Sequence, residues 1–389
     1  MSETLTVSQR QVLNFRLAGQ HLNQRLPAGS LLEAAEACGI RNTPPGSAIL
    51  EMNTRVGGIT RAAFEQATAV DKELLNTWSI ANNTYFFPTR DLPVFTSALL
   101  PDPSDEQSWR FLVRATIAVY DKAGVQVGES IKKIGEVMGD ILAQGPLPKG
   151  ELSTALSQRV PQDWLYWCQG CGAYHVPETS FRLGAWWGGF CITPGDGKDN
   201  LFMRTDRWLE EKLPPEMDRQ AARRELLRRY LRCYGPSTVT HFAEWAGIAP
   251  AHARQIWQLL QEELVEVNFA GKQTWLHRED AVKLQAAPSP RPVVLLPPYD
   301  PYLMCRDRET FLPDKTLHKK VWNAIGNPGI LLVEGIVTGI WRPQKKGKHF
   351  LLKLEAFAPL SREVCADIEA EAQLQAPLRG CVSSEVSYS

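Results

Sequence analysis

The fold is decided by residues 235–262, which read GPSTVTHFAEWAGIAPAHARQIWQLLQE. The opening Gly-Pro-Ser-Thr forms a turn and a helix cap, and the residues after it predict a helix over Val239–Ala246 that Gly247 ends. A second helix is predicted over Pro250–Glu262, because its apolar residues recur on one face. This stretch therefore predicts two helices joined by a tight turn.

The flanking residues complete a known motif. An arginine-rich helix is predicted over Ala221–Cys233, and two strands are predicted at Leu264–Phe269 and Gln273–Leu276. Helix, short helix, helix and hairpin is the order of a winged helix-turn-helix, whose second turn-linked helix enters the DNA major groove. On that helix, Arg254 and Gln258 are the groove-facing candidates.

Similar outlines recur toward the N-terminus. Residues 1–102 are predicted to form a first winged helix, with helices over Gln9–Leu26, Ser30–Ala37, Ser47–Arg55 and Asp71–Leu75 and hairpin strands at Trp78–Ile80 and Thr84–Phe87. Residues 103–215 are predicted to form a second, with helices over Asp105–Lys122, Gly128–Leu142, Lys149–Val160 and Pro177–Trp187 and strands around a turn at 195–197.

The C-terminal part has a different pattern. After a third winged helix at 216–287, residues 288–376 predict a small antiparallel sheet or barrel and a packing helix over Ser361–Ala376. The tail, 377–389, shows no periodicity and is predicted to be disordered. The predicted fold class is α+β: tandem winged-helix domains followed by a small C-terminal antiparallel β-sheet or barrel.

Composition excludes several classes of protein. The 389 residues carry 43 basic and 43 acidic side chains, so a DNA-binding face must come from local clustering of charge. The N-terminus is polar, and no apolar run approaches the ~18 residues that span a bilayer, so we expect a cytoplasmic protein without a membrane partner. Eight cysteines in a long chain favour reduced thiols over a disulfide framework.

Several stretches stand in a fixed order along the chain: Gly39–Ala48, Asn76–Trp78, Arg228–Pro236, Glu244–Gly247, Leu295–Leu303 with Arg306–Arg308, and Gly335–Trp341. This ordered set resembles the winged-helix DNA-binding family of AlkZ/YcaQ-type DNA glycosylases. The resemblance implies three tandem winged helices and a β-barrel that cradle double-stranded DNA, and excision of alkylated bases such as N7-alkylguanine or crosslinked ones. We expect a nucleoid-associated monomer.

The resemblance also places a catalytic position. Active members carry Gln-x-Gln or Gln-x-Asp, which falls on Arg41-Asn42-Thr43 in this chain. A guanidinium is permanently cationic and cannot accept a proton from water. One interpretation is altered chemistry run by Arg41 and Thr43 with help from Glu51. The other is that catalysis was lost, that Arg41 and Asn42 contact DNA, and that Glu51 is a solvated or salt-bridged helix residue.

A cysteine-bearing loop suggests a metal site. Cys168 and Cys171 stand in a C-x2-C turn with His175 after them, a spacing that suits a structural Zn²⁺. Cys191 is the best candidate for a fourth ligand, and Cys233 is a weaker one. The alternatives are buried free thiols or a redox pair, although the loop lacks the βαβ context of a thioredoxin-like pair.

Other candidate DNA contacts are basic clusters. Arg223, Arg224 and Arg228 crowd one predicted helix, where they either neutralise phosphates or pair with neighbouring acids. The basic turn with Lys345, Lys346 and Lys348 either grips phosphate or only solubilises the chain.

Two aromatic motifs have plain structural alternatives. The pair Trp186-Trp187 is either a wedge for a flipped base or part of the core, and Tyr299–Tyr302 is interpreted as an architectural turn.

Three functions remain open on the sequence. The first is a DNA glycosylase or a degenerate one, and the second is a non-catalytic DNA-binding protein such as a damage sensor or transcriptional regulator. The third is a zinc-stabilised interaction scaffold without a DNA role, which the zero net charge keeps open.

Overall fold

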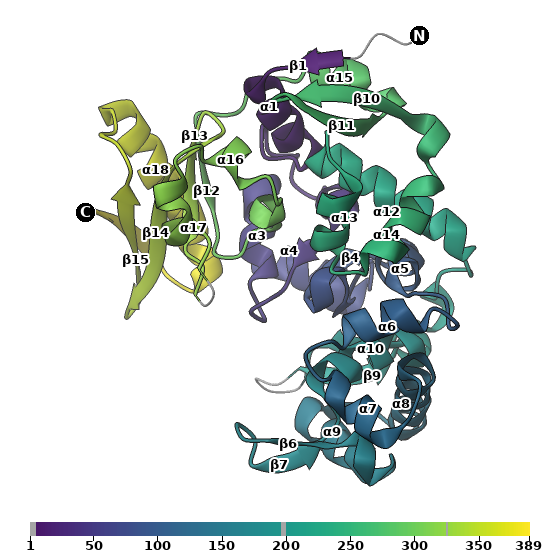
Figure 1. The fold of residues 1–389 in the computed structure, drawn as a ribbon. Helices are drawn as coiled ribbons and strands as arrows, with labels where there is room; N and C mark the ends of the chain where they lie inside the picture. The colour runs from purple at the N-terminus through teal and green to yellow at the C-terminus, as the bar shows by residue number, and fades with distance from the viewer. Residues whose placement is uncertain (1–4, 196–199, 324–325) are drawn as a thin grey trace. The chain divides into compact units, whose positions relative to one another are not determined.

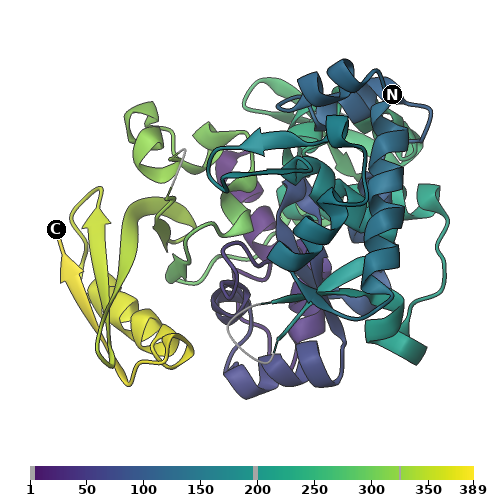
Figure 2. The same cartoon turned by 90° about the horizontal axis from the view of Figure 1, so that it is seen from below.

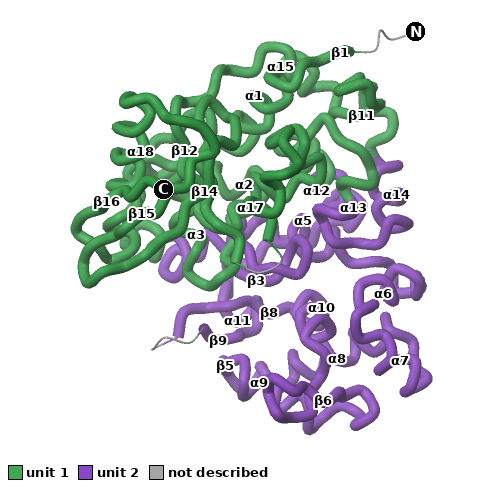
Figure 3. Tube along the Cα trace, turned by 60° about the vertical axis from the view of Figure 1, so that its left-hand side comes forward, with its two compact units in different colours: residues 1–66, 227–242, 260–389 green, residues 67–226, 243–259 purple. Residues whose placement is uncertain are grey.

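The computed structural model describes residues 5–195, 200–323 and 326–389. The chain divides into two compact units, coloured separately in Figure 3. Unit 1 comprises residues 1–66, 227–242 and 260–389, and unit 2 comprises residues 67–226 and 243–259. Each unit is assembled from separate stretches of the chain, so neither coincides with one predicted domain. The predicted boundaries at 102, 215 and 287 stay predictions.

The N-terminal helix of unit 1, α1 (Gln9–Gly19), begins at a capping box in which Ser8 and Gln11 exchange hydrogen bonds. It is shorter than predicted and ends at Gly19, where a Cβ atom would lie 2.3 Å from the Arg232 carbonyl oxygen. The elements that follow are α2 (Leu31–Cys38), β2 (Ile40–Arg41), α3 (Ala48–Arg55) and α4 (Arg61–Glu65), with a π-helical turn over Gln66–Val70.

The C-terminal part of unit 1 is a five-stranded sheet in the order β12-β13-β14-β15-β16. The first four strands are antiparallel neighbours, and α18 lies along one face (Figures 1 and 2). Apolar side chains of the sheet and of α18, such as Leu295, Trp341 and Ile368, form its core. The bounds are β12 (Val293–Leu296), β13 (Gly329–Val333), β14 (Ile336–Lys346), β15 (His349–Ala356) and α18 (Arg362–Gln375).

The prediction of a disordered tail is wrong. Residues Ser383–Tyr388 form β16, which pairs in parallel with β15 from His349–Ser383 to Leu354–Tyr388. The pairing depends on a partner far away in the sequence, so local periodicity does not reveal it. The sheet is therefore mixed rather than purely antiparallel, and β12 and β16 are its edges.

A long connection between β12 and β13 contains only short helices. They are a 3-10 turn over Pro301–Met304, α16 (Arg308–Phe311), a 3-10 turn over Lys315–Leu317 and α17 (His318–Val321). This connection supplies residues to the candidate site described below.

The stretch that opened the analysis has the predicted element order. Three helices, α12 (Arg219–Tyr234), α13 (Val239–Ala246) and α14 (Pro250–Gln258), precede the hairpin of β10 (Leu264–Phe269) and β11 (Lys272–His277). Strand β1 (Leu5–Val7) joins this hairpin in parallel with β10, and α15 (Ala281–Gln285) follows it. The unit boundaries fall inside the stretch, so its assignment as a winged helix stays a prediction.

Unit 2 has a helical core around α8 and α10. Besides α14, its helices include α5 (Leu92–Phe95), α6 (Glu106–Leu112), α7 (Ile117–Ala123), α8 (Val127–Leu142), α9 (Lys149–Ser157), α10 (Glu178–Gly188) and α11 (Thr205–Leu209). Its strands are β3 (Leu74–Trp78), β4 (Thr84–Pro88), β5 (Leu147–Pro148), β6 (Tyr166–Cys168), β7 (Ala173–His175), β8 (Phe190–Thr193) and β9 (Leu201–Arg204).

Two predicted helices of unit 2 are wrong. Residues Asp71–Leu75 do not form a helix, because β3 starts at Leu74 and is buried along its whole length. The predicted helix over Asp105–Lys122 is two helices, α6 and α7, that are separated after Leu112. The predicted turn at 195–197 lies largely outside the described residues. Across the described ranges, no helix combines the length and apolarity needed to cross a membrane.

Helices α8 and α10 approach each other at glycines. A Cβ atom on Gly135 would lie 2.7 Å from the Gly184 carbonyl oxygen and 2.9 Å from the Gly188 backbone nitrogen. Backbone atoms cannot move aside as a flexible side chain can, so this crossing depends on the missing side chain. Gly150 in α9 has no atom within 4 Å of the same position.

We therefore expect Gly135→Ala to destabilise the protein by about 1–3 kcal/mol through overpacking. The control Gly150→Ala places the same methyl group in open space and should be neutral or stabilise by up to about 1 kcal/mol, because alanine is the better helix former. Urea denaturation followed by circular dichroism measures both. Equal effects of the two substitutions would contradict the tight crossing.

Candidate functional site

A buried ion pair joins the N-terminal helices of unit 1 to the connection after β12. Arg55 Nη1 and Nη2 each donate to one oxygen of Asp300 at 2.9 Å, and both side chains are at most 3% exposed. Asp300 Oδ1 also accepts the backbone N–H of Tyr302 at 2.9 Å and so caps the short helix at Pro301. Asp300 thus connects the turn at Tyr299–Tyr302 to α3. This structural role is consistent with the interpretation of Tyr299–Tyr302 as an architectural turn.

Glu51 lies one helical turn before Arg55 and is fully buried. Burial raises the pKa of its carboxyl well above the usual range, and the negative charge of Asp300 adds to the effect, while Arg55 opposes it. Oε2 accepts the backbone N–H of Arg41 at 2.8 Å, and Oε1 has no hydrogen-bond partner among the described atoms. The interpretation of Glu51 as a solvated residue is therefore wrong.

Arg41 is held against Tyr299. Its Nη1 donates to the Tyr299 carbonyl oxygen at 3.3 Å, and its guanidinium carbon lies 5.3 Å from the centroid of the Tyr299 ring. A space of about 40 Å³ beside both residues, lined also by Trp322, is large enough for a water molecule. The predicted catalytic position thus presents a fixed cation next to a small space that both polar and apolar side chains line.

The two residues after Arg41 differ in exposure. Asn42 is 5% exposed, and its Oδ1 accepts the backbone N–H groups of Gly46 at 2.8 Å and Ala48 at 3.5 Å. Asn42 therefore shapes the loop before α3, and the prediction that it contacts DNA is wrong because its side chain is enclosed. Thr43 is half-buried in the same loop.

These three predicted catalytic residues lie near one another but offer little general-base chemistry. Arg41 cannot accept a proton, the Thr43 hydroxyl is a weak base, and burial favours the neutral form of Glu51. The arrangement can hold a water molecule or an anion beside Arg41. It does not present an exposed group that takes a proton from water.

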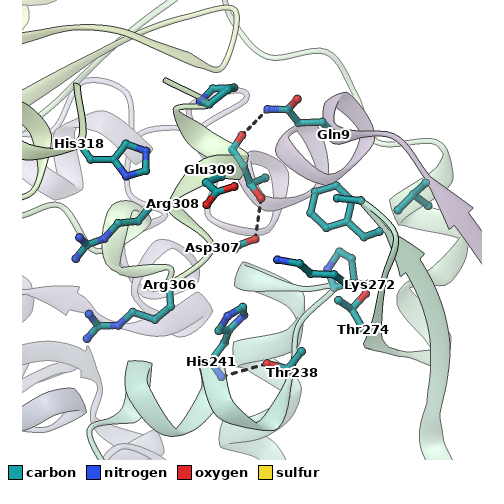
Figure 4. Close-up of a pocket in the computed structure, with 16 residues that line it drawn as sticks. Gln9, Thr238, His241, Lys272, Thr274, Arg306, Asp307, Arg308, Glu309 and His318 are labelled. Carbon is teal, nitrogen blue, oxygen red and sulfur yellow. Dashed lines mark hydrogen bonds between the residues drawn. The ribbon is translucent and has the colours of Figure 1, made fainter. Parts of the chain in front are cut away.

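A larger cavity of about 690 Å³ opens elsewhere in unit 1. Side chains reach it from α1, from the start of α13, from the β10–β11 hairpin and from the connection after β12 (Figure 4). Its volume falls within the ~300–1,000 Å³ of ordinary ligand sites. Its basic side chains are His241, Lys272, Arg306, Arg308 and His318.

The acids of this cavity are already paired. Asp307 accepts a hydrogen bond from Arg16 at 2.8 Å and one from Thr310 at 3.0 Å, and Glu309 lies 2.8 Å from Lys315. Burial is the largest single influence and would raise the pKa of Asp307, but the charge and hydrogen bond of Arg16, the hydrogen bond of Thr310 and the charge of His241 together keep this pKa below its usual value. Basic side chains outnumber these two acids in the lining, which suits the cavity to an anion such as a phosphate.

The arginines of α12 do not form the predicted phosphate-binding face. The Arg223 side chain is 7% exposed and donates to the Leu100 carbonyl oxygen at 2.9 Å and to Asp102 at 3.2 Å. The prediction that Arg223 binds DNA is wrong, since it is enclosed and paired. Arg224 donates to the Leu259 carbonyl oxygen, and Arg228 donates to the carboxylate of Glu263. These two arginines are therefore also engaged within the protein, as the alternative to phosphate binding supposed.

The other predicted contacts are accessible. Arg254 and Gln258 are exposed on α14. Lys345, Lys346 and Lys348 are exposed at the end of the β14–β15 hairpin, where Lys345 donates to the Arg379 carbonyl oxygen at 3.3 Å. Their role in DNA binding stays a prediction.

The tryptophan pair of α10 belongs to the core of unit 2. Trp186 donates its indole N–H to the Trp78 carbonyl oxygen, and the Trp187 ring meets the Trp109 ring edge-on at 6.4 Å. Both tryptophans pack against the buried apolar cluster of unit 2. They are therefore part of the core, which was the alternative to a wedge for a flipped base.

The cysteine loop brings three of the predicted ligands together. The ligand atoms of Cys168, Cys171 and His175 lie within 4.8 Å of one another. Cys191 is outside this group. It is fully buried in β8, and its thiol is not among the ligand atoms that lie together, so the prediction of Cys191 as the fourth ligand is wrong. Cys233 is buried in α12 and donates to the Gly19 carbonyl oxygen.

Comparison with known proteins identifies the family. The family model described as DNA glycosylase AlkZ-like matches residues 34–377. This chain belongs to the AlkZ-like DNA glycosylase family. An interstrand DNA cross-link repair glycosylase of Streptomyces sahachiroi is 22% identical over 356 residues, which cover 87% of this chain and 88% of that protein. The solved structure of the Streptomyces sahachiroi DNA glycosylase AlkZ matches 99% of this chain and 100% of that one, with a TM-score of 0.79 and 21% identity.

Membership in the AlkZ-like family supports a DNA-binding, glycosylase-like function. The structural match shows a shared mixed α/β fold with a C-terminal sheet. Sequence reasoning missed the cavity residues His241, Lys272 and His318, because nothing in their local pattern connects them. Arg306-Asp307-Arg308 did carry a signal, since this stretch was part of the resemblance.

The buried pair of this AlkZ-like chain gives a test of stability. Asp300→Asn keeps an acceptor for Tyr302 but leaves the Arg55 charge unpaired, so we expect a loss of about 3–5 kcal/mol in the free energy of unfolding. Asp121→Asn breaks a pair with Arg110 that is 42–51% exposed and should cost at most about 1 kcal/mol. Similar losses in both variants would be inconsistent with the buried pair.

The burial of Glu51 can be tested through the pH dependence of the protein's stability. Above its usual pKa of 4.5 the unfolded chain loses the proton of Glu51, while the folded chain keeps it. The unfolded state then binds fewer protons, so this residue lowers stability as pH rises. Glu51→Gln has no such proton, and its stability relative to the natural chain should increase from about pH 4 toward neutrality. Denaturation at several pH values measures the difference in the free energy of unfolding between the variant and the natural chain. If this difference does not vary with pH, the burial argument is refuted.

Proposed function

We propose that this chain binds duplex DNA without excising bases by the Gln-x-Gln or Gln-x-Asp route of its family. The observation that carries the proposal is Arg41, a fixed cation held by Tyr299 at the position of that motif. An N7-alkylated guanine and a developing oxocarbenium ion are both cationic, so Arg41 would repel them. The same cation would favour a phosphate group.

The DNA would be held through its phosphates. The anion-suited cavity with Lys272 and Arg308 and the exposed lysines of the β14–β15 hairpin support phosphate binding. The helix and hairpin order of residues 219–277 supports a winged-helix unit that contacts the duplex. The interstrand cross-link repair activity in the name of the Streptomyces sahachiroi relative makes crosslinked or alkylated duplex the first substrate to test.

The test combines excision with binding. Purified protein is incubated with duplex DNA that contains N7-methylguanine or an interstrand crosslink, and abasic sites are quantified next to duplex binding by fluorescence anisotropy. We expect duplex binding and no abasic sites above the uncatalysed background. Abasic sites that appear in proportion to protein concentration would overturn the non-excising proposal.

A second candidate function is excision by altered chemistry, which Glu51 specifically favours. Its carboxyl is buried next to the motif, has a raised pKa and has one oxygen without a partner among the described atoms. A carboxyl with a raised pKa holds its proton to higher pH and is able to give that proton to a leaving base. If excision is observed, Glu51→Gln should lower its rate by about 100-fold or more under this mechanism, with unchanged duplex binding.

The cavity gives a prediction about salt. If Lys272 and Arg308 neutralise phosphates, Lys272→Ala and Arg308→Ala should each weaken duplex binding and reduce the slope of log affinity against log salt by about 1. Lys122→Ala, which removes an exposed lysine of α7, is the matched control and should change neither. A natural chain that does not bind duplex at low salt would instead favour the interaction scaffold without a DNA role.

A further inference from the structure

The β6–β7 hairpin brings two thiols and an imidazole to one point. Cys168 ends β6, Cys171 lies in the turn, and His175 ends β7 opposite Tyr166. Their ligand atoms lie within 4.8 Å of one another. From this geometry we infer that the hairpin binds one Zn²⁺ ion through Cys168, Cys171 and His175.

The turn between the cysteines has a backbone that aims both thiols at the same side. The Cys168 carbonyl oxygen accepts the N–H of Cys171 at 3.2 Å and the N–H of Gly172 at 2.9 Å. Gly172 has a φ of +62°, a left-handed conformation that glycine adopts without steric cost. The C-x2-C-G sequence is thus required by the turn that places the two sulfur atoms together.

His175 is oriented as a metal ligand. Its Nδ1 lies 2.7 Å from the Val176 carbonyl oxygen. A carbonyl oxygen only accepts hydrogen bonds, so Nδ1 carries a proton, and the tautomer that this selects has its lone pair on Nε2. Metal-binding histidines commonly donate their other ring N–H to a carbonyl or carboxylate, which fixes the ring and the tautomer. The hydrogen bond to Val176 therefore prepares Nε2 to bind an ion.

One face of the hairpin is exposed. It is a two-stranded sheet, and the side chains of Trp167 and Tyr174 are 53% and 62% exposed, in contact with each other at 5.2 Å between ring centroids. A two-stranded hairpin is only marginally stable in water by itself. An ion that joins the turn to the end of β7 would hold the two strands in register.

The three protein ligands favour a particular metal ion and leave one of its coordination positions open. Two thiolates and an imidazole suit Zn²⁺, which prefers four tetrahedral ligands. Within the described ranges, no fourth Cys, His, Asp or Glu belongs to this group, and Cys171 is exposed. We therefore assign the fourth position to a water molecule, which an added small ligand can replace.

The first experiment measures bound metal. The full chain is purified without chelators, dialysed against metal-free buffer and analysed by inductively coupled plasma mass spectrometry. We expect about one zinc per chain, and strongly reduced zinc in Cys168→Ser and Cys171→Ser. Cys365→Ser removes a half-buried thiol of α18 and should keep the full zinc content. Circular dichroism shows whether each variant is folded.

The proposal is overturned if the natural chain holds no zinc and takes up none after reduction and addition of excess Zn²⁺. It is also overturned if Cys168→Ser and Cys365→Ser retain equal amounts of zinc. A Cys168–Cys171 disulfide that forms in the presence of Zn²⁺ under mild air oxidation would favour the redox pair instead.

A second measurement tests the ligand set. Cobalt substitution should give a thiolate-to-cobalt charge-transfer band and the intense visible bands of a tetrahedral site. His175→Ala should change the visible bands but keep the charge-transfer band, because both thiolates remain. Added imidazole should shift the visible bands if the fourth position holds water. Weak octahedral bands without a thiolate band would refute the site.

Discussion

The ion pair between Arg55 and Asp300 is the constraint on which the candidate site depends. Its two charges are buried together, and a buried charge that loses its partner is strongly destabilising. The turn that carries Asp300 also carries Tyr299, so the pair fixes the surface against which Arg41 rests. The geometry at the family's motif position is therefore set by a residue on a different part of the chain.

A second arginine fastens the same connection. Arg16 of α1 is 1% exposed and binds Asp307 and the carbonyl oxygens of Gly235 and Pro236. The segment after β12 is thus held at two points by helices from the first sixty residues. Because its own helices are short, these two attachments, rather than regular secondary structure, hold the segment in place, and Asp307 lies in the lining of the cavity.

Local signals in the sequence predicted the elements that local physics determines. The bounds of α13 and β10 were predicted to the residue, because a cap, a terminating glycine and a tight turn lie within the stretch. The strand β3 was mistaken for a helix, since the charges at 71–73 suggested a solvent-exposed face although the residues from Leu74 onward are buried. Strand β16 was missed because its pairing partner lies outside any local window.

The site was predictable only in part, for the same reason. The resemblance located Arg41 and Thr43, and residue spacing located the metal group. The burial of Glu51 depends on Asp300 and its surroundings, which the neighbours of Glu51 in the sequence do not indicate. Arg223 appeared to be one of several surface arginines, whereas Asp102 and the Leu100 carbonyl hold it inside unit 2.

The last strand also has a consequence for how the molecule avoids self-association. Strand β15 would offer a long row of unpaired amide and carbonyl groups if β16 were absent, and such an edge is a template for pairing with another chain. The strand that covers it is short and polar and carries Glu385. Strand β16 thus takes the place of β15 as the edge of the sheet, and its charged and polar side chains make that edge a poorer template for a strand of another molecule than β15 would be.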